Sequence, residues 1–264
     1  MLIREPAVAG LFYPADKHEL RQYVGALLGP PASPRAEDAA IQPKALIVPH
    51  AGYIYSGAVA ASVYQMLFPW RQNIKRIILL GPAHRVYLQG MAIPSVAGFR
   101  TPLGTVALDT GALANLATQP GVHVADDAHA QEHCLEVQLP FLQVLLDTFS
   151  LVPIIVGQCD PQQVAGVIDS VWGGAETLLI ISSDLSHYLP YTKAQALDHL
   201  TEQRILHRDA TLGGNEACGA HAINGLLVNQ HVADLKITSI DMRNSGDTAG
   251  DKSRVVGYGA FILY

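Results

Sequence analysis

The chain has 264 residues, of which 23 are acidic and 17 are Lys or Arg, so its formal net charge is −6. Hydrophobic residues make up 49% of the chain and charged residues only 15%, which provides a large core and excludes an intrinsically disordered protein. The acidic balance and the absence of a basic run argue against nucleic acid as a partner, because binding to phosphates needs clustered Lys and Arg.

The N-terminus and the cysteines indicate the compartment. The first residues lack a basic region followed by an apolar stretch, so we expect no secretion signal. No apolar run approaches the roughly 20 residues that span a bilayer, so we expect no membrane partner. Cys134, Cys159 and Cys218 are widely spaced and form no C-x-x-C motif, which argues against a disulfide framework or a structural zinc site. Together these features predict a cytoplasmic protein.

Short apolar runs alternate along the chain with longer segments of helical periodicity. Strands are predicted at residues 45–48, 76–80, 151–156, 177–181, 236–242 and 254–263. Helices are predicted at about residues 57–68, 161–171, 190–208 and 216–230, a hairpin or loop excursion at 90–108, and a surface segment at 29–34. Buried β-branched runs that alternate with helices are typical of βαβ units. We therefore expect an α/β fold with a mostly parallel central sheet flanked by helices, in a single domain over residues 1–264.

Candidate ligands follow four of the predicted strands. His50 follows residues 45–48, His84 follows 76–80, Asp184 and His187 follow 177–181, and Asp247 follows the strand that ends near residue 242. Because ligands bind beyond the carboxyl ends of parallel strands, these side chains should converge on one site. Two imidazoles and one carboxylate form the ligand set of non-haem Fe(II) oxygenases, and zinc with an activated water is the chemical alternative.

Each of these residues also has a purely structural interpretation. A histidine at a strand end often bonds to its own backbone, and Asp247 in a Gly-rich segment is typical of a turn former. Asp184 could orient His187 or cap a helix N-terminus. His187 could carry a proton near neutral pH, because an unperturbed imidazole has a pKa of about 6.5.

A second cluster is the segment Glu132-His133-Cys134-Leu135-Glu136. His133 and Glu136 are three residues apart, so in a helix they share a face, although a solvated first turn is the alternative. We expect His133 to join His187 and Asp184 as a catalytic residue. The expected cleft residues are Glu136, His221, Cys218 and Tyr53. The other histidines are expected at the surface, namely His18, His123, His129, His199, His207 and His231.

Several segments, in the same order along the chain, resemble those of the Memo-like family, also called AmmeMemoRadiSam system protein B. The matching segments are Pro6–Pro14, Pro49–Gly57, Leu80–His84, Glu132–Pro140, Ser182–His187, Cys218–His221 and Ser245–Asp251. The resemblance implies a fold similar to the class III extradiol ring-cleavage dioxygenases. It implies that His50 and His84 are metal ligands, that Asp247 is the third ligand and that His187 is the acid/base. An aspartate ligand favours Fe(II) over copper, with Zn, Cu or no metal as the alternatives.

The resemblance implies two main functions. The first is a dioxygenase-like oxidoreductase with a mononuclear non-haem metal site that acts on an unknown small substrate. The second is a non-catalytic adaptor that binds a peptide or protein in the same cleft. The family's longer name adds a third possibility, an accessory role beside a radical-SAM protein and an AMMECR-type partner. Fold analogy does not decide between these functions.

Overall fold

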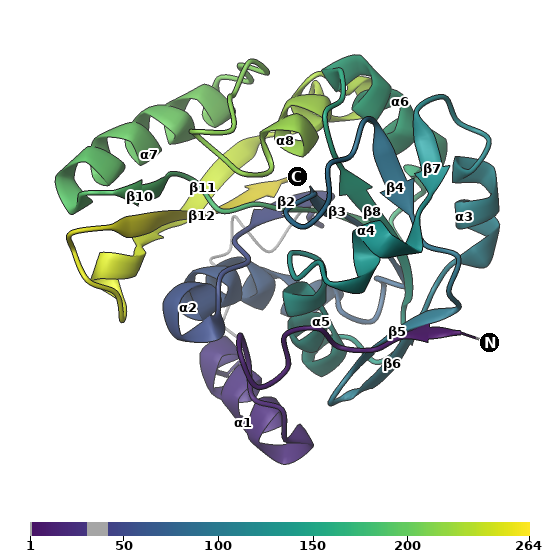
Figure 1. Cartoon of the computed structure of the whole chain (residues 1–264), viewed down its shortest axis with the longest axis horizontal. Helices are drawn as coiled ribbons and strands as arrows, with labels where there is room; N and C mark the ends of the chain where they lie inside the picture. Colours follow the sequence, from purple (N-terminus) through teal and green to yellow (C-terminus); the bar gives the residue numbers. More distant parts are fainter. Residues whose placement is uncertain (1, 31–41) are drawn as a thin grey trace.

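A mixed β-sheet runs through the centre of the molecule with helices on both faces (Figure 1). The computed structural model describes residues 2–30 and 42–264, so most of the predicted surface segment 29–34 lies outside the described residues. Within these ranges the strand order is β10-β12-β2-β9-β3-β8-β4-β7, and β11 pairs with β12. The strands are β2 (Ala45–Val48), β3 (Arg76–Pro82), β4 (Met91–Ile93), β7 (Val122–Val124), β8 (Ser150–Val156), β9 (Thr177–Ser182), β10 (His187–Leu189), β11 (Ile237–Asn244) and β12 (Val255–Leu263).

The α/β fold predicted from the sequence is confirmed. The four central strands β2, β9, β3 and β8 are parallel to one another, as expected. The outer part of the sheet differs, because β12 pairs antiparallel with β2 and β11, and β4 pairs antiparallel with β8. The short connection between β11 and β12 accounts for the β11–β12 pair, since a parallel pair needs a longer crossover. The sheet is therefore mixed, with a parallel centre.

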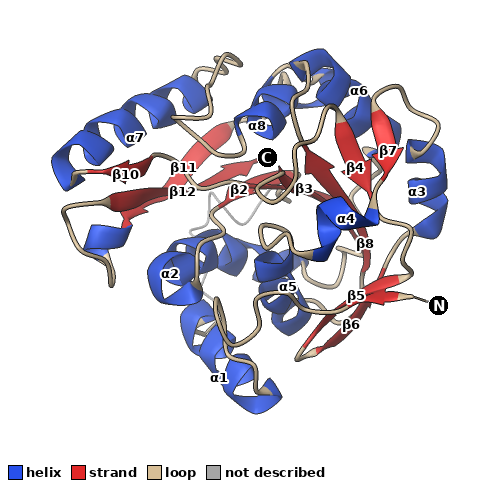
Figure 2. Cartoon of the chain, viewed as in Figure 1, coloured by secondary structure: helices blue, strands red, loops and turns tan. Residues whose placement is uncertain are grey.

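Helices cover the two faces of this sheet in separate groups (Figure 2). One group contains α1 (Lys17–Leu28), α2 (Tyr53–Tyr64) and α5 (Leu139–Leu145). The other contains α6 (Pro161–Val171), α7 (Tyr191–Leu206) and α8 (Ala220–Leu227). Helix α6 begins where the sequence predicts, because Pro161 occupies its first position and Asp160 forms a capping box with Gln163.

The helix after β2 begins earlier than the sequence suggests. It was expected near Gly57, but α2 starts at Tyr53 and continues as a 3₁₀ helix through Gln65–Trp70. Gly57 lies inside this helix where it contacts α1, and a Cβ atom at position 57 would come within 2.9 Å of Leu27 Cδ1. The glycine therefore permits a close crossing of the two helices. Because α2 starts at Tyr53, the loop before it is only four residues long.

A second, smaller sheet holds the N-terminal segment. It contains β1 (Ile3–Arg4), β5 (Gly98–Thr101) and β6 (Gly104–Ala107), and the β5–β6 hairpin lies in the excursion expected at residues 90–108. The helices α3 (Thr110–Leu116) and α4 (Asp126–Ala130) were not predicted from the sequence. None of the helices in the described ranges has the length and apolar character needed to cross a bilayer.

Candidate metal centre

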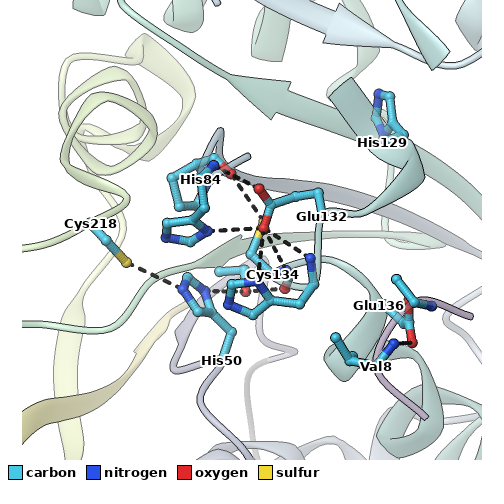
Figure 3. A network of polar contacts seen from close by, with 12 residues as sticks. Val8, His50, His84, His129, Glu132, Cys134, Glu136 and Cys218 are labelled. Atoms are coloured by element: carbon cyan, nitrogen blue, oxygen red, sulfur yellow. Dashed lines mark hydrogen bonds and ion pairs between the residues drawn. The ribbon is translucent and has the colours of Figure 1, made fainter. Parts of the chain in front are cut away.

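Three histidines, His50, His84 and His133, meet beyond the carboxyl ends of the parallel strands. Figure 3 shows two of them, His50 and His84, with Glu132 beside His84. His50 comes two residues after β2, His84 comes two residues after β3, and His133 lies in the turn before the 3₁₀ helix Glu136–Gln138. Their potential ligand atoms all lie within 4.8 Å of one another. The ring centroid of His50 is 5.2 Å from that of His84 and 5.4 Å from that of His133, and the latter two are 4.8 Å apart.

A buried carboxylate, Glu132, orients two of these rings. Its Oε1 accepts a hydrogen bond from His84 Nδ1 at 2.9 Å and lies 3.2 Å from His133 Nδ1. Its Oε2 accepts the backbone N–H of His84 at 2.7 Å. The His84 ring therefore keeps its proton on Nδ1, and its Nε2 is left with a free lone pair, whereas the nearby Nδ1 of His133 forms no hydrogen bond with a described residue. A carboxylate that accepts a hydrogen bond from the far ring nitrogen of a metal-binding histidine fixes the tautomer of that ring.

Glu132 stays ionised in this position. Burial, the largest single influence on its pKa, favours the neutral acid, but the hydrogen bonds from His133 and His84 together outweigh it. The net result is a pKa far below the usual range of a glutamate. A permanent negative charge therefore lies behind the two imidazoles and raises their basicity toward an ion in front of them.

A separate network sets the tautomer of His50. Ser182 Oγ donates to Cys134 O at 2.6 Å and accepts from Gln138 Nε2 at 2.8 Å. Its remaining contact, with His50 Nδ1 at 3.0 Å, must use the imidazole as the donor. His50 Nε2 is then unprotonated. Burial, followed by the neighbouring imidazoles, also holds the pKa of His50 well below its usual value, so the ring is neutral.

Cys218 approaches the same nitrogen from another part of the chain. Its Sγ lies 3.3 Å from His50 Nε2 and accepts the backbone N–H of Asp184 at 3.3 Å. Burial raises the pKa of the thiol above its usual value, so the sulfur is protonated and donates to the imidazole. The expectation that Cys218 lines the cleft agrees with this placement.

The histidine cluster opens into a cleft of about 800 Å³. His187, expected to be the acid/base, lines this cleft at the start of β10. Its Nδ1 donates to Leu185 O at 2.8 Å, so Nε2 is the free nitrogen. The ring can therefore accept a proton from a molecule in the cleft.

Asp184 also lines the cleft, but most of it is buried. Its Oδ1 accepts the backbone N–H of His50 at 2.7 Å, and it fixes the loop that carries this histidine. It does not cap a helix, because β10 follows it directly. Burial is the main cause that raises the pKa of Asp184, and the hydrogen bond from His50 works against that rise.

Asp247 lies elsewhere. Its Oδ1 accepts the hydroxyl of Tyr191, and its Oδ2 accepts the backbone N–H of Asn244 at 3.0 Å. It lines a different pocket of about 280 Å³, and among the described residues it belongs to no group of close potential ligands. The capping box between Asn244 and Asp247 closes this turn on itself. The expected set of His50, His84 and Asp247 is thus not brought together in the structure, and the group of close potential ligands contains His133 instead.

Glu136 does not face the cleft, and the helix face that it was expected to share with His133 is not formed. Its carboxylate accepts from Arg4 Nη1 at 2.7 Å and from Tyr13 Oη at 2.5 Å. The alternative of a solvated turn does not hold either, because Glu132 and Glu136 are 2% and 0% exposed. Glu136 therefore anchors the N-terminal segment.

Two further expected cleft residues have structural contacts instead. The hydroxyl of Tyr53 donates to Val137 O at 2.6 Å from a buried position in α2. His221 Nδ1 bonds to Cys159 O at 3.0 Å, and neither residue lines the cleft. Among the histidines expected at the surface, His129 is buried, and its Nε2 bonds to Ala92 O at 3.0 Å.

The residues that orient the site were not predicted from the sequence. Glu132 was noted only as part of the segment around His133, and Gln138 was not singled out. A signal was present, because Glu132 is next to His133 and Ser182 precedes the Asp184 loop. The hydrogen bonds that orient the site join segments far apart in the chain. His84 and Glu132 are 48 residues apart, and Gln138 and Ser182 are 44 residues apart.

Comparisons with known proteins agree with this description. The family model for Memo-like proteins matches residues 4–262. A MEMO1 family protein of Aquifex aeolicus is 36% identical over the full length of both chains, and one of Ignicoccus hospitalis is 37% identical over 98% of each. The crystal structure of an uncharacterized Escherichia coli K12 protein, JW3007, shares the fold with a TM-score of 0.52, at 13% identity and over 83% of this chain and 99% of that one. The chain therefore belongs to the Memo-like family.

Proposed function

We propose that this chain is a mononuclear metal-dependent oxidoreductase whose ion is held by His50, His84 and His133. The observation that supports this most is the convergence of the three rings: their potential ligand atoms all lie within 4.8 Å of one another, and hydrogen bonds at Nδ1 leave the Nε2 atoms of His50 and His84 unprotonated. Neutral imidazoles with free nitrogens are the form that binds a metal. The donor set therefore fits a divalent transition ion.

Fe(II) is the ion that we favour, because the resemblance to the class III extradiol dioxygenases implies it. Imidazole nitrogen suits Fe, Zn and Cu alike, whereas Mg²⁺ and Ca²⁺ prefer oxygen ligands. When bound, Fe(II) supplies open coordination positions and a source of electrons for reactions of small molecules with dioxygen. Zn and Cu are the competing ions in the test below.

The chain's own residues have distinct tasks in such a reaction. Glu132 and Ser182 hold the ligands in the correct tautomer, so little reorganisation is needed when the ion binds. His187 accepts a proton from the substrate at Nε2, while its Nδ1 stays fixed to Leu185 O. Tyr258 and Val256 form part of the cleft wall against which the substrate would lie.

The test is metal content and oxygen consumption after anaerobic loading with Fe(II), Zn(II) or Cu(II). We expect about one Fe(II) per chain in the wild type and less than about a tenth of that in His50→Ala, because the ring supplies one of three ligands. His123→Ala is the matched control, since His123 is exposed on β7 and, among the described residues, belongs to no group of close potential ligands. Iron uptake equal in the wild type and His50→Ala would overturn the proposal.

A peptide-binding adaptor is the second candidate, and a specific feature favours it. Apolar side chains near the cleft are exposed, including Leu11 at 80% and Tyr188 at 63%. An open apolar rim is typical of a surface that binds a larger partner. Oxygen consumption by the iron-loaded protein separates the two, because an adaptor has none. The accessory role beside a radical-SAM protein stays a prediction.

A further inference from the structure

We propose that the substrate of this cleft is a small organic oxyanion with a flat apolar body, and that Arg85 and Arg254 bind its anionic group. The inference deepens the proposed function and rests on it for the place of the substrate beside the three histidines. Three features of the cleft support this inference, namely its charges, its strained backbone and its aromatic walls.

The two arginines reach the cleft from different elements. Arg85 directly follows His84, Arg254 directly precedes β12, and both line the cleft with exposed side chains. Across residues 2–30 and 42–264, neither guanidinium forms an ion pair, whereas Arg4 and Arg204 do. An unpaired guanidinium presents planar N–H donors that match a carboxylate or phosphate.

The acidic residues that face these arginines are engaged in other bonds. Asp184 Oδ1 accepts the backbone N–H of His50, and Asp251 Oδ1 accepts that of Ser253 at 2.7 Å. The ionised Glu132 behind the imidazoles would compensate one of the two charges of a bound divalent ion. A bound ion would therefore leave one further positive charge beside the guanidinium groups of Arg85 and Arg254, although the chain as a whole carries a net charge of −6.

Tyr188 places one of the arginines through a strained backbone. Its φ is 60°, a left-handed conformation that is uncommon for an aromatic residue, and it lies in an irregularity of the β10–β12 pairing between His187 and Leu189. The conformation directs the ring to Arg254, whose Cζ lies 5.1 Å from the ring centroid. The ring holds the face of the guanidinium and leaves its N–H edges free. Strain of this kind concentrates at ligand-binding sites.

The walls of the cleft favour a planar body. Phe12, Tyr55 and Tyr258 line it together with Tyr188. Phe12 packs edge-on against His133 with ring centroids 4.8 Å apart, so an aromatic surface continues to the metal-binding residues. A flat molecule can lie along these rings while its anionic group meets the arginines.

The test uses benzoate, phenyl phosphate and neutral benzamide as probes of the full chain, with and without Fe(II). We expect the better of the two anions to bind at least about tenfold more tightly than benzamide. Arg85→Gln and Arg254→Gln should each weaken anion binding about tenfold and leave benzamide binding unchanged. Tyr188→Asn, which tolerates the left-handed backbone, should weaken it about threefold. Arg71→Gln, an exposed arginine outside the cleft, is the matched control.

The outcomes separate this inference from the proposed function. Anion binding that depends on both arginines but occurs without metal uptake supports the oxyanion site and removes the metal enzyme. Normal iron uptake with equal binding of anions and benzamide, or with arginine variants that bind like Arg71→Gln, overturns the oxyanion site alone. Failure of all three probes to bind the wild type also overturns it. The tighter of the two anions identifies the group as carboxylate or phosphate.

Discussion

The carboxylate of Glu132 contacts the imidazoles of both His84 and His133, so Glu132 is the most informative single residue to replace. Replacing it by Gln removes the negative charge and offers only one acceptor oxygen to the groups that now share Oε1 and Oε2. We expect Glu132→Gln to weaken metal affinity by about 10- to 100-fold, measured by competition with a chelator. Glu5→Gln, at an exposed carboxylate, is the control. An affinity equal to that of the control would show that the carboxylate does not tune the ligands.

His129 makes stability depend on pH. Burial is the main cause that lowers the pKa of His129 to about 4, and no described group forms a hydrogen bond with its buried Nδ1. The native state therefore keeps the ring neutral, while the unfolded chain takes up a proton below about pH 6.5. Its contribution to stability is present above pH 6.5 and is lost as the pH falls from 6.5 toward 4.

This sign leads to a measurable difference between variants. From pH 7 to pH 4 the free energy of unfolding should fall less in His129→Gln than in the wild type, by up to about 3 kcal/mol. Urea titrations at a series of pH values measure it, and His123→Gln should behave as the wild type does. Parallel curves for the wild type and His129→Gln would contradict this account.

At the scale of elements, a buried ion pair attaches β1 to the segment that carries the site. Arg4 and Glu136 meet at 2.7 Å with side chains 5% and 0% exposed, and Arg4 also donates to Glu132 O and His129 O. Removing one partner leaves a buried charge, so Arg4→Met should lower the free energy of unfolding by about 3–5 kcal/mol. It should also reduce metal uptake, because the turn with His133 loses its anchor.

The control for this prediction is an exposed pair in the same region. Arg100 and Glu5 have side chains 49% and 62% exposed, so Arg100→Gln should change stability by less than about 1 kcal/mol. Chemical denaturation of both variants measures the difference. Equal effects of Arg4→Met and Arg100→Gln would show that the buried pair does not hold the two elements together.

The same pair explains how much of the site could be predicted from the sequence. The parallel strands depend on local apolar runs and were predicted correctly, and the structure places His50 and His84 directly beyond two of them, as the sequence indicates. The position of His133 depends on where the segment before α5 docks, and that is set by Arg4 and Glu136, which lie 132 residues apart in the chain. No local pattern encodes such a contact.

On the scale of the whole molecule, the antiparallel strands at the β10–β12 end of the sheet determine which side chains enter the cleft. The short turn between β11 and β12 closes on itself through Asn244 and Asp247, which keeps Asp247 out of the histidine cluster. The resemblance to dioxygenases led to the expectation of a carboxylate ligand from this turn. The fold itself agrees with the resemblance, while the group of close potential ligands in the structure contains His133 and not Asp247.

Metal content per chain tests this central claim most directly. The wild type, His133→Ala and Asp247→Ala would be loaded anaerobically with Fe(II), freed of excess ion and analysed by inductively coupled plasma mass spectrometry. The account predicts about one ion per chain in the wild type and in Asp247→Ala, and less than about a tenth of that in His133→Ala. Full occupancy in His133→Ala together with loss of the ion in Asp247→Ala would contradict it.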